Sequence, residues 1–267
     1  MKKPFVFIHS LISLDGRLQG HYMKLPEETA AAPFFKGIGF SGRIYNSNTQ
    51  LCGSKTCELD YTYGNKPDLD ENAAPVPEGD FIAEKNAEAY LIALDRKGTL
   101  GWQQNFVPYA GVKQHVISVI TEQVSNAYKD FLRRKGVSYI ICGDKDLDFE
   151  MIVEKCATLF DNIKDIKVTG GGYVNWAFLR SGLVDEVSVV IVSGADGSSK
   201  TPGLFTAGEG NFADIPVALD LIETEVDKES GGVWLRYKVK KVWDYDEFDK
   251  EIGFAPKDFI AVDNSGK

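Results

Sequence analysis

The stretch Thr169-Gly170-Gly171-Gly172-Tyr173-Val174-Asn175 lies between a strand-like and a helix-like segment of the chain. Three consecutive glycines let the backbone approach a ligand closely, and the start of a helix offers unpaired amides and the positive end of its dipole. This combination suits a pyrophosphate group. The stretch is not GxGxxG, so the Rossmann fingerprint is absent. Taken alone, the glycines are explained equally well by a tight passage from strand to helix.

Strand-like and helix-like segments alternate on both sides of this stretch. Hydrophobic patterning predicts strands at residues 5–9, 50–53, 89–94, 114–120, 137–142, 166–168 and 187–192, and helices at 124–135, 149–160 and 173–180. Gly136 is a natural stop for the first of these helices. Alternation of this kind predicts an α/β fold with a mostly parallel central sheet and helices on its faces.

The C-terminal part differs in pattern. Residues 217–226 and 233–239 flank the turn-forming segment 227–232, which predicts an antiparallel hairpin at the edge of the sheet. We expect one domain over residues 1–241, with insertions at about 61–80 and 193–211. Loops of this length are usually lids or excursions. Residues 242–267 form a C-terminal extension that we expect to pack through Trp243, Tyr245 and Phe248.

Charge and cysteine usage narrow the class of protein. The 30 Lys and Arg residues against 39 Asp and Glu residues give a net charge of -9, which disfavours nucleic acid and anionic membranes as partners. No apolar run is long enough to cross a bilayer, and we interpret the N-terminal apolar stretch as a first strand. The four cysteines contain no CxxC pair and the three histidines are scattered, so we expect a metal-free, cytoplasmic protein.

Besides the glycine stretch, two further segments that could contact a phosphate follow predicted strands. Gly53-Ser54-Lys55-Thr56 breaks one strand, with Ser54 or Thr56 able to cap the next helix and Lys55 offering a cation. Asp95-Arg96-Lys97 delivers two cations after another strand. Each signal alone is more simply explained by a capped helix or solvated charges. Together they are stronger, because ligands of open α/β sheets gather beyond the carboxyl ends of the strands.

The first strand is followed by Ser13-Leu14-Asp15-Gly16-Arg17. Asp15 is placed to accept hydrogen bonds from a substrate, or to form an Asx turn before Gly16. The spacing of residues in the chain offers no Ser-His-Asp or Cys-His arrangement, so the sequence indicates no catalytic residues for a hydrolase.

Four motifs, taken in order, resemble a known family. These are residues 13–17, the 53–56 turn, Leu94-Asp95-Arg96, and Gly170-Gly171-Gly172 followed by Gly182-Leu183-Val184-Asp185-Glu186. They resemble the reductase domain of bifunctional riboflavin-biosynthesis deaminase-reductases, over roughly residues 4–240. The resemblance implies a dihydrofolate-reductase-like three-layer fold. The zinc-binding deaminase domain of that family has no counterpart in this sequence.

The resemblance also implies a cofactor, an assembly and site residues. NADPH is the expected hydride donor and a homodimer the expected assembly. The implied cofactor-binding residues are Leu11, Gly53, Ser54, Thr56, Asp60, Arg96, Gly170, Gly171, Gly172, Tyr173 and Val174, with Arg96 at the adenosine 2′-phosphate. The substrate end involves Ser13, Asp15, Arg43 and Thr169. The riboflavin reductases usually have Glu where this chain has Thr169.

The expected activity is reduction of 5-amino-6-(5-phosphoribosylamino)uracil, with hydride transfer to a ribosylamino carbon and with Asp15 or a water molecule as proton donor. Two alternatives stay open. One is a reductase of another small heterocycle or carbonyl compound on the same fold. The other is a nucleotide-binding protein without turnover.

Overall fold

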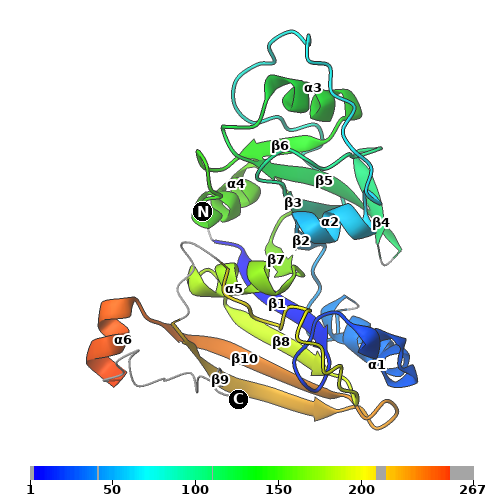
Figure 1. Cartoon of the computed structure of the whole chain (residues 1–267), viewed down its shortest axis with the longest axis vertical. Helices are drawn as coiled ribbons and strands as arrows, with labels where there is room; N and C mark the ends of the chain where they lie inside the picture. The colour runs from blue at the N-terminus through cyan, green and yellow to red at the C-terminus, as the bar shows by residue number, and fades with distance from the viewer. Residues whose placement is uncertain (1–2, 41, 110, 209–214, 253–267) are drawn as a thin grey trace, which may run out of the picture.

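The computed structural model describes residues 3–40, 42–109, 111–208 and 215–252, and these form a sheet of ten strands with helices on both faces (Figure 1). The strands are β1 (Phe5–Ile12), β2 (Thr49–Gly53), β3 (Ala89–Leu94), β4 (Phe106–Tyr109), β5 (Val112–Ile120), β6 (Ser138–Ile141), β7 (Asp165–Val168), β8 (Glu186–Ile191), β9 (Val217–Val226) and β10 (Val233–Val242).

The strand order is β4-β5-β3-β2-β7-β1-β8-β10-β9, with β6 also paired to β5. The inner strands and β6 run parallel, whereas β10 and β9 form the antiparallel hairpin at one edge. The predicted α/β fold and its C-terminal hairpin are therefore confirmed. The short strand β4 pairs antiparallel with β5 at the other edge and was not predicted.

The helices are α1 (Pro26–Gly39), α2 (Ser54–Asp60), α3 (Asn126–Lys135), α4 (Phe149–Leu159), α5 (Gly172–Arg180) and α6 (Tyr245–Ile252), with a 3₁₀ turn η1 (His21–Lys24). Residues of α4 and α5 join one buried cluster with β1, β3 and β7, while α3 belongs to a second cluster with β3 and β5. Gly136 ends α3 in the left-handed conformation, as expected. Helix α1 was not predicted, because Pro33 inside it weakens the helical pattern.

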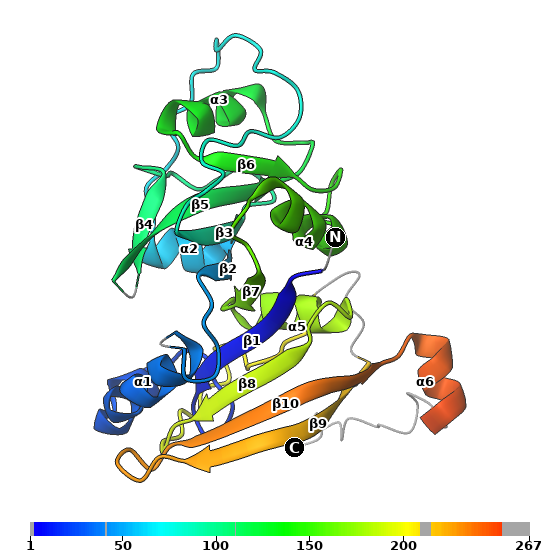
Figure 2. The same ribbon diagram turned by 180° about the vertical axis from the view of Figure 1, so that it is seen from behind.

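The insertion at 61–80 lies against α3, at the end of the molecule away from α5 (Figures 1 and 2). Asn126 Oδ1 accepts from the backbone N–H of Val76 at 2.8 Å, and Arg134 Nη2 donates to the carbonyl of Asp68 at 2.7 Å. These bonds fix the insertion as an excursion rather than a lid over the glycine turn.

The C-terminal extension begins as α6. The rings of Trp243 and Phe248 meet edge to face at 5.7 Å, and Arg180 Nη1 donates to the carbonyl of Trp243 at 2.8 Å. The expected packing through these two aromatic residues is thus present. The side chain of Tyr245 and residues 253–267, like 209–211 of the second insertion, lie outside the described residues.

All four cysteines are free and buried. Cys52 and Cys57 lie at the end of β2 and in α2, Cys142 directly follows β6, and Cys156 lies on the buried side of α4. Within the described ranges, no helix has the length and apolarity that a membrane crossing requires.

A buried hydrogen-bond network joins α1, β1, β8 and β10. His9 Nε2 donates to the carbonyl of Phe35 at 3.0 Å, so its Nδ1 accepts from Ser188 Oγ at 2.9 Å. The same Ser188 Oγ accepts from Trp234 Nε1 at 2.8 Å. Burial lowers the pKa of His9 to about 3, so the ring stays neutral and this pattern holds at neutral pH.

We predict that Ser188→Ala lowers the free energy of unfolding by about 2 to 4 kcal/mol, because it leaves Trp234 Nε1 and His9 Nδ1 buried without partners. Urea unfolding of the variant measures this loss. The control Ser193→Ala removes an exposed hydroxyl bonded to the carbonyl of Gly231 and should cost about 0.5 kcal/mol or less. Equal, small losses in both variants would show that the network does not hold the strands together.

Candidate active site

Four of the segments singled out in the sequence lie along one edge of the sheet. They follow β1, β2, β3 and β7, which are mutually parallel and occupy neighbouring positions in the order β3-β2-β7-β1. The carboxyl ends of parallel strands share an edge, so residues 13–17, 53–56, 95–97 and 169–174 are brought to the same side of the molecule. This is the edge at which open α/β sheets bind their ligands.

The three glycines at the start of α5 have different surroundings. A Cβ on Gly170 would lie 2.6 Å from the side chain of Val174, and one on Gly172 would lie 2.1 Å from the carbonyl oxygen of Gly203. A Cβ on Gly171, the N-cap of α5, would meet nothing within 4 Å. Gly170 and Gly172 are therefore required by packing, and Gly171 leaves open space at the positive end of the helix.

The turn after β2 packs against the same helix. A Cβ on Gly53 would approach Val174 Cγ2 to 2.8 Å, so the two cofactor candidates are in contact. Gly53 is itself the N-cap of α2 and no side chain caps this helix, so the expectation that Ser54 or Thr56 caps it is wrong. Ser54 is exposed, and partial burial raises the pKa of Asp60 at the end of α2.

Asp15 is engaged by a distant loop. Its carboxylate accepts from the backbone N–H groups of Asp196 and Gly197 at 2.8 and 2.9 Å, and from Ser13 Oγ at 2.7 Å. These bonds hold the pKa of Asp15 well below its usual range. A carboxyl group that stays ionised is a poor proton donor, which argues against the donor role expected for Asp15. It instead fastens the second insertion beside β1.

That insertion also contacts the glycine turn. Thr206 donates its backbone N–H to the carbonyl of Gly172 at 3.1 Å, and Asn175 Nδ2 donates to the carbonyl of Leu204 at 3.1 Å. Leu11, inside β1, accepts from the hydroxyl of Tyr22 at 3.4 Å through its carbonyl. The second insertion is thus the long loop that borders the site.

The two candidate arginines are paired with carboxylates. Arg96 forms an ion pair with Asp146, and both side chains are exposed. Arg43 forms an ion pair with Glu225 of β9 and lies over the ring of Phe34 at 5.4 Å. Arg43 is therefore directed toward the hairpin and not toward the carboxyl edge, so the structure does not support it as a substrate anchor.

Thr169 is bonded to the neighbouring strand. Its Oγ1 lies 3.0 Å from Cys52 Sγ and 3.3 Å from the carbonyl oxygen of Leu51. Its side chain thus fills the junction of β7 and β2. Because β7 alternates its faces, Lys167 projects on the same side as Thr169.

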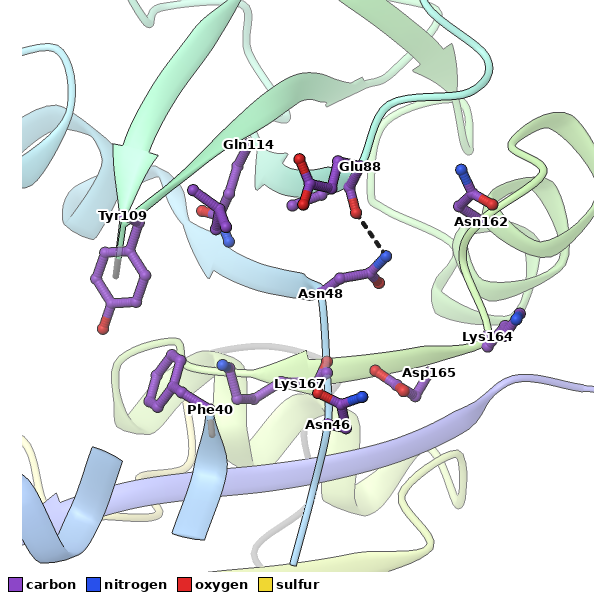
Figure 3. A pocket seen from close by; sticks show the side chains of 13 residues that line it. Phe40, Asn46, Asn48, Glu88, Tyr109, Gln114, Asn162, Lys164, Asp165 and Lys167 are labelled. Atoms are coloured by element: carbon purple, nitrogen blue, oxygen red, sulfur yellow. Dashed lines mark hydrogen bonds between the residues drawn. The ribbon is translucent and has the colours of Figure 1, made fainter. Parts of the chain in front are cut away.

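Sequence reasoning missed a polar pocket on this face of the sheet, shown in Figure 3. Lys167 is almost fully buried in it, with its Nζ 3.1 Å from the ring centre of Phe40 and 3.5 Å from the carbonyl oxygen of Gly39. Burial lowers the pKa of Lys167 to about 7, against an attraction to Asp165. A lysine inside the apolar run Ile166-Lys167-Val168 was the sequence signal for this pocket.

A metal centre has no visible basis in the residues described. Among them, no three His, Cys, Asp or Glu side chains are grouped so as to hold an ion.

The chain is thus an α/β domain whose central strands end at a glycine-lined edge. Over residues 4–230 the chain matches the family described as the RibD C-terminal domain, and it belongs to that family. The family comprises NAD(P)H-dependent reductases related to riboflavin biosynthesis.

Individual relatives agree with this assignment. A 2,5-diamino-6-ribosylamino-4(3H)-pyrimidinone 5′-phosphate reductase of Aquifex aeolicus is 29% identical over 94 residues, which are 35% of this chain and 41% of that protein. A pyrimidine reductase-like protein of Corynebacterium diphtheriae superposes with a TM-score of 0.58 at 15% identity, covering 89% of this chain and 92% of the other. The riboflavin biosynthesis reductase of Saccharomyces gives 0.51 at 20% identity, covering 89% and 90%. These two structural likenesses support the shared fold.

We predict that Lys167 makes the free energy of unfolding rise with pH above pH 7. Its folded-state pKa of about 7 lies below the ordinary 10.5, so above pH 7 the unfolded chain binds one more proton than the folded one. The free energy of unfolding then rises with pH, by at most about 1.4 kcal/mol per unit. Lys167→Met lacks this rise, so it should be more stable than the natural protein near pH 6 and lose this advantage toward pH 10.

Denaturant unfolding of both proteins across this range measures the difference. Lys24→Met, which removes an exposed lysine, should leave the pH dependence unchanged. A difference that does not vary with pH would contradict the lowered pKa.

Proposed function

We propose that the protein is an NADPH-dependent reductase that transfers a hydride to the ribosylamino carbon of a riboflavin-pathway pyrimidine, of the 5-amino-6-(5-phosphoribosylamino)uracil type. The observation that carries the proposal is the open space over Gly171, at the start of α5 and beside three other strand ends. Membership in the RibD C-terminal domain family supports the reaction class. We further propose a cytoplasmic homodimer, in line with the resemblance.

The cofactor residues follow from the arrangement of the strand ends. The first amides of α5, from Gly172 to Val174, would hold the pyrophosphate, since such amides have no partner within their helix. Gly53, Ser54, Thr56 and Asp60 would line the neighbouring turn, and the backbone of Leu11 the nicotinamide end. NADPH, when bound, supplies the hydride. The contribution of the chain is to orient it and to exclude water.

The substrate end would lie between the loop after β1 and the turn after β2. Asp15, ionised and bonded to two amides of the second insertion, would hold that loop in place beside Ser13. The proton required by the reduced product would then come from water rather than from Asp15. Thr169 would border the reacting carbon.

Two observations favour another small heterocycle or carbonyl compound as the substrate. Arg43 is directed toward Glu225 of the hairpin and away from the carboxyl edge, so it is not placed to bind a ribosyl phosphate there. Thr169, where the riboflavin reductases usually have Glu, is bonded to Cys52. Oxidation of NADPH in a panel that includes the pathway pyrimidine and other cyclic imines and carbonyls would identify the substrate class. Binding of NADPH without turnover on any of them would favour a nucleotide-binding protein.

We predict that Gly171→Val folds normally, since its Cβ finds open space, but weakens NADPH binding at least about tenfold by displacing the pyrophosphate. Fluorescence titration with NADPH and thermal unfolding measure the two effects. The comparison variant Gly172→Ala should instead unfold at a lower temperature, because its Cβ would collide with Gly203. Tight NADPH binding by Gly171→Val would exclude this cofactor site.

We also predict that Arg96→Ala weakens NADPH binding roughly tenfold and leaves NADH binding nearly unchanged, since a charge-assisted contact to the 2′-phosphate is lost. Asp146→Ala, which releases Arg96 from its ion pair, should shift the preference toward NADPH. Calorimetric titration of the natural protein and both variants with NADPH and NADH measures the affinities to be compared. An equal loss for NADPH and NADH in Arg96→Ala would show that Arg96 does not bind the 2′-phosphate.

A further inference from the structure

The pocket around Lys167 exists because β2 and β7 separate. The two strands are paired only at Gln50–Lys167 and Leu51–Val168, and toward their amino ends they diverge. The gap is a cavity of about 520 Å³ (Figure 3). Phe40 and Tyr109, with ring centres 5.5 Å apart, close it at the end nearer the carboxyl edge.

Two opposite charges face this cavity without forming an ion pair in the described part of the chain. Lys167 is almost fully buried. Its ammonium group nevertheless makes one long hydrogen bond, to the carbonyl of Gly39, and one cation–π contact, with the ring of Phe40. The Oδ1 atom of Asp165 is buried and has no hydrogen-bond partner among the described residues. Ser47 hydrogen-bonds to the carboxyl group of Asp165, so the remaining capacity of this group is at Oδ1. Both Asp165 and Lys167 thus keep hydrogen-bonding capacity for a ligand in the cavity.

The remaining wall is polar and balanced in charge. Lys164 and Glu88 add one further charge of each sign, and Asn46 and Gln114 add carboxamides. A phosphate group entering the cavity would meet the carboxylates of Asp165 and Glu88, and an ammonium group would meet both lysines. Hydroxyl groups avoid both conflicts, because each one donates to a carboxylate and accepts from an ammonium group.

The aromatic end of the cavity fits the same chemistry. Phe40 and Tyr109 offer an apolar surface on which the C–H groups of a carbon chain can pack. Lys167 in β7 and Thr169 directly after this strand lie two residues apart on the same side, about 6 to 7 Å along the chain. A ligand whose reacting carbon lies near Thr169 would therefore extend a chain of a few carbons to Lys167.

We propose that the cavity between β2 and β7 binds the hydroxyl-rich chain of a neutral polyol or open-chain sugar, with Lys167 donating to it and Asp165 accepting from it. This inference rests on the proposed function only in assigning the chain to the substrate of the reductase, and there it favours the alternative of a substrate without a terminal phosphate over the phosphoribosylamino pyrimidine. The binding site itself stands on the geometry of the cavity.

Saturation-transfer difference NMR with ribitol as the probe tests the proposal on the full chain. Signals from ribitol are expected with the natural protein and with the control Lys24→Met, and they should fall about tenfold in Lys167→Met and in Asp165→Asn. Lys167→Met removes a buried charge, so its fold is retained, and Asp165→Asn preserves the shape of the side chain. Thermal unfolding of each variant checks both points.

Two results would overturn the proposal. One is ribitol that gives no signal, or the same signal in all four proteins. The other is inorganic phosphate, followed by phosphorus NMR, that binds in a manner dependent on Lys167. NADPH titration and turnover measurements on the same variants test the reductase activity independently of the polyol site. Ribitol binding that depends on Lys167 and Asp165 without turnover on any substrate supports the site and contradicts the reductase. Turnover with KM unchanged in Lys167→Met contradicts the site and leaves the reductase standing.

Discussion

The two backbone pairs between β2 and β7 are the constraint on which the molecule depends. Strands on either side are joined over four to six residue pairs, whereas this junction has only Gln50–Lys167 and Leu51–Val168. The pairs hold the carboxyl ends of β2 and β7 together, beside the carboxyl end of β1. They leave the amino ends of β2 and β7 apart, and this separation forms the cavity. One short contact therefore creates both an edge that suits a cofactor and an interior that accepts polar groups.

The cost of this arrangement is a lysine in the core. Lys167 occupies a position that an apolar side chain would fill with less loss of solvation. Its Nζ is accommodated by the ring of Phe40 rather than by a carboxylate. The glycine turn shows a similar division of labour, since packing alone accounts for Gly170 and Gly172 and open space remains only over Gly171. In both places, the residue that packing does not explain adjoins open space.

Much of the fold could be predicted from the sequence, because most strands are short apolar runs bounded by turn residues. The strand at 89–94 was predicted with its observed bounds, and the C-terminal hairpin was placed correctly. The partners of Asp15 could not be foreseen, because Asp196 and Gly197 lie some 180 residues further on in a loop without periodic pattern. The pairing of Arg43 with Glu225 is equally long in range. The sequence therefore indicated the candidate segments. Which of their charged side chains already have partners within the protein was shown only by the tertiary contacts.

The buried cysteines divide between two places, and this has a consequence for how openings of the fold become visible. Cys52 and Cys57 adjoin the junction of β2 and β7, whereas Cys142, after β6, and Cys156, in α4, belong to one buried cluster. A thiol shielded from solvent reacts with an alkylating reagent only when its surroundings open, so its rate of modification measures the free energy of that opening. Alkylation of Cys52 and Cys57 would therefore report openings at the junction of β2 and β7. Alkylation of Cys142 and Cys156 would report openings of the core beside α4.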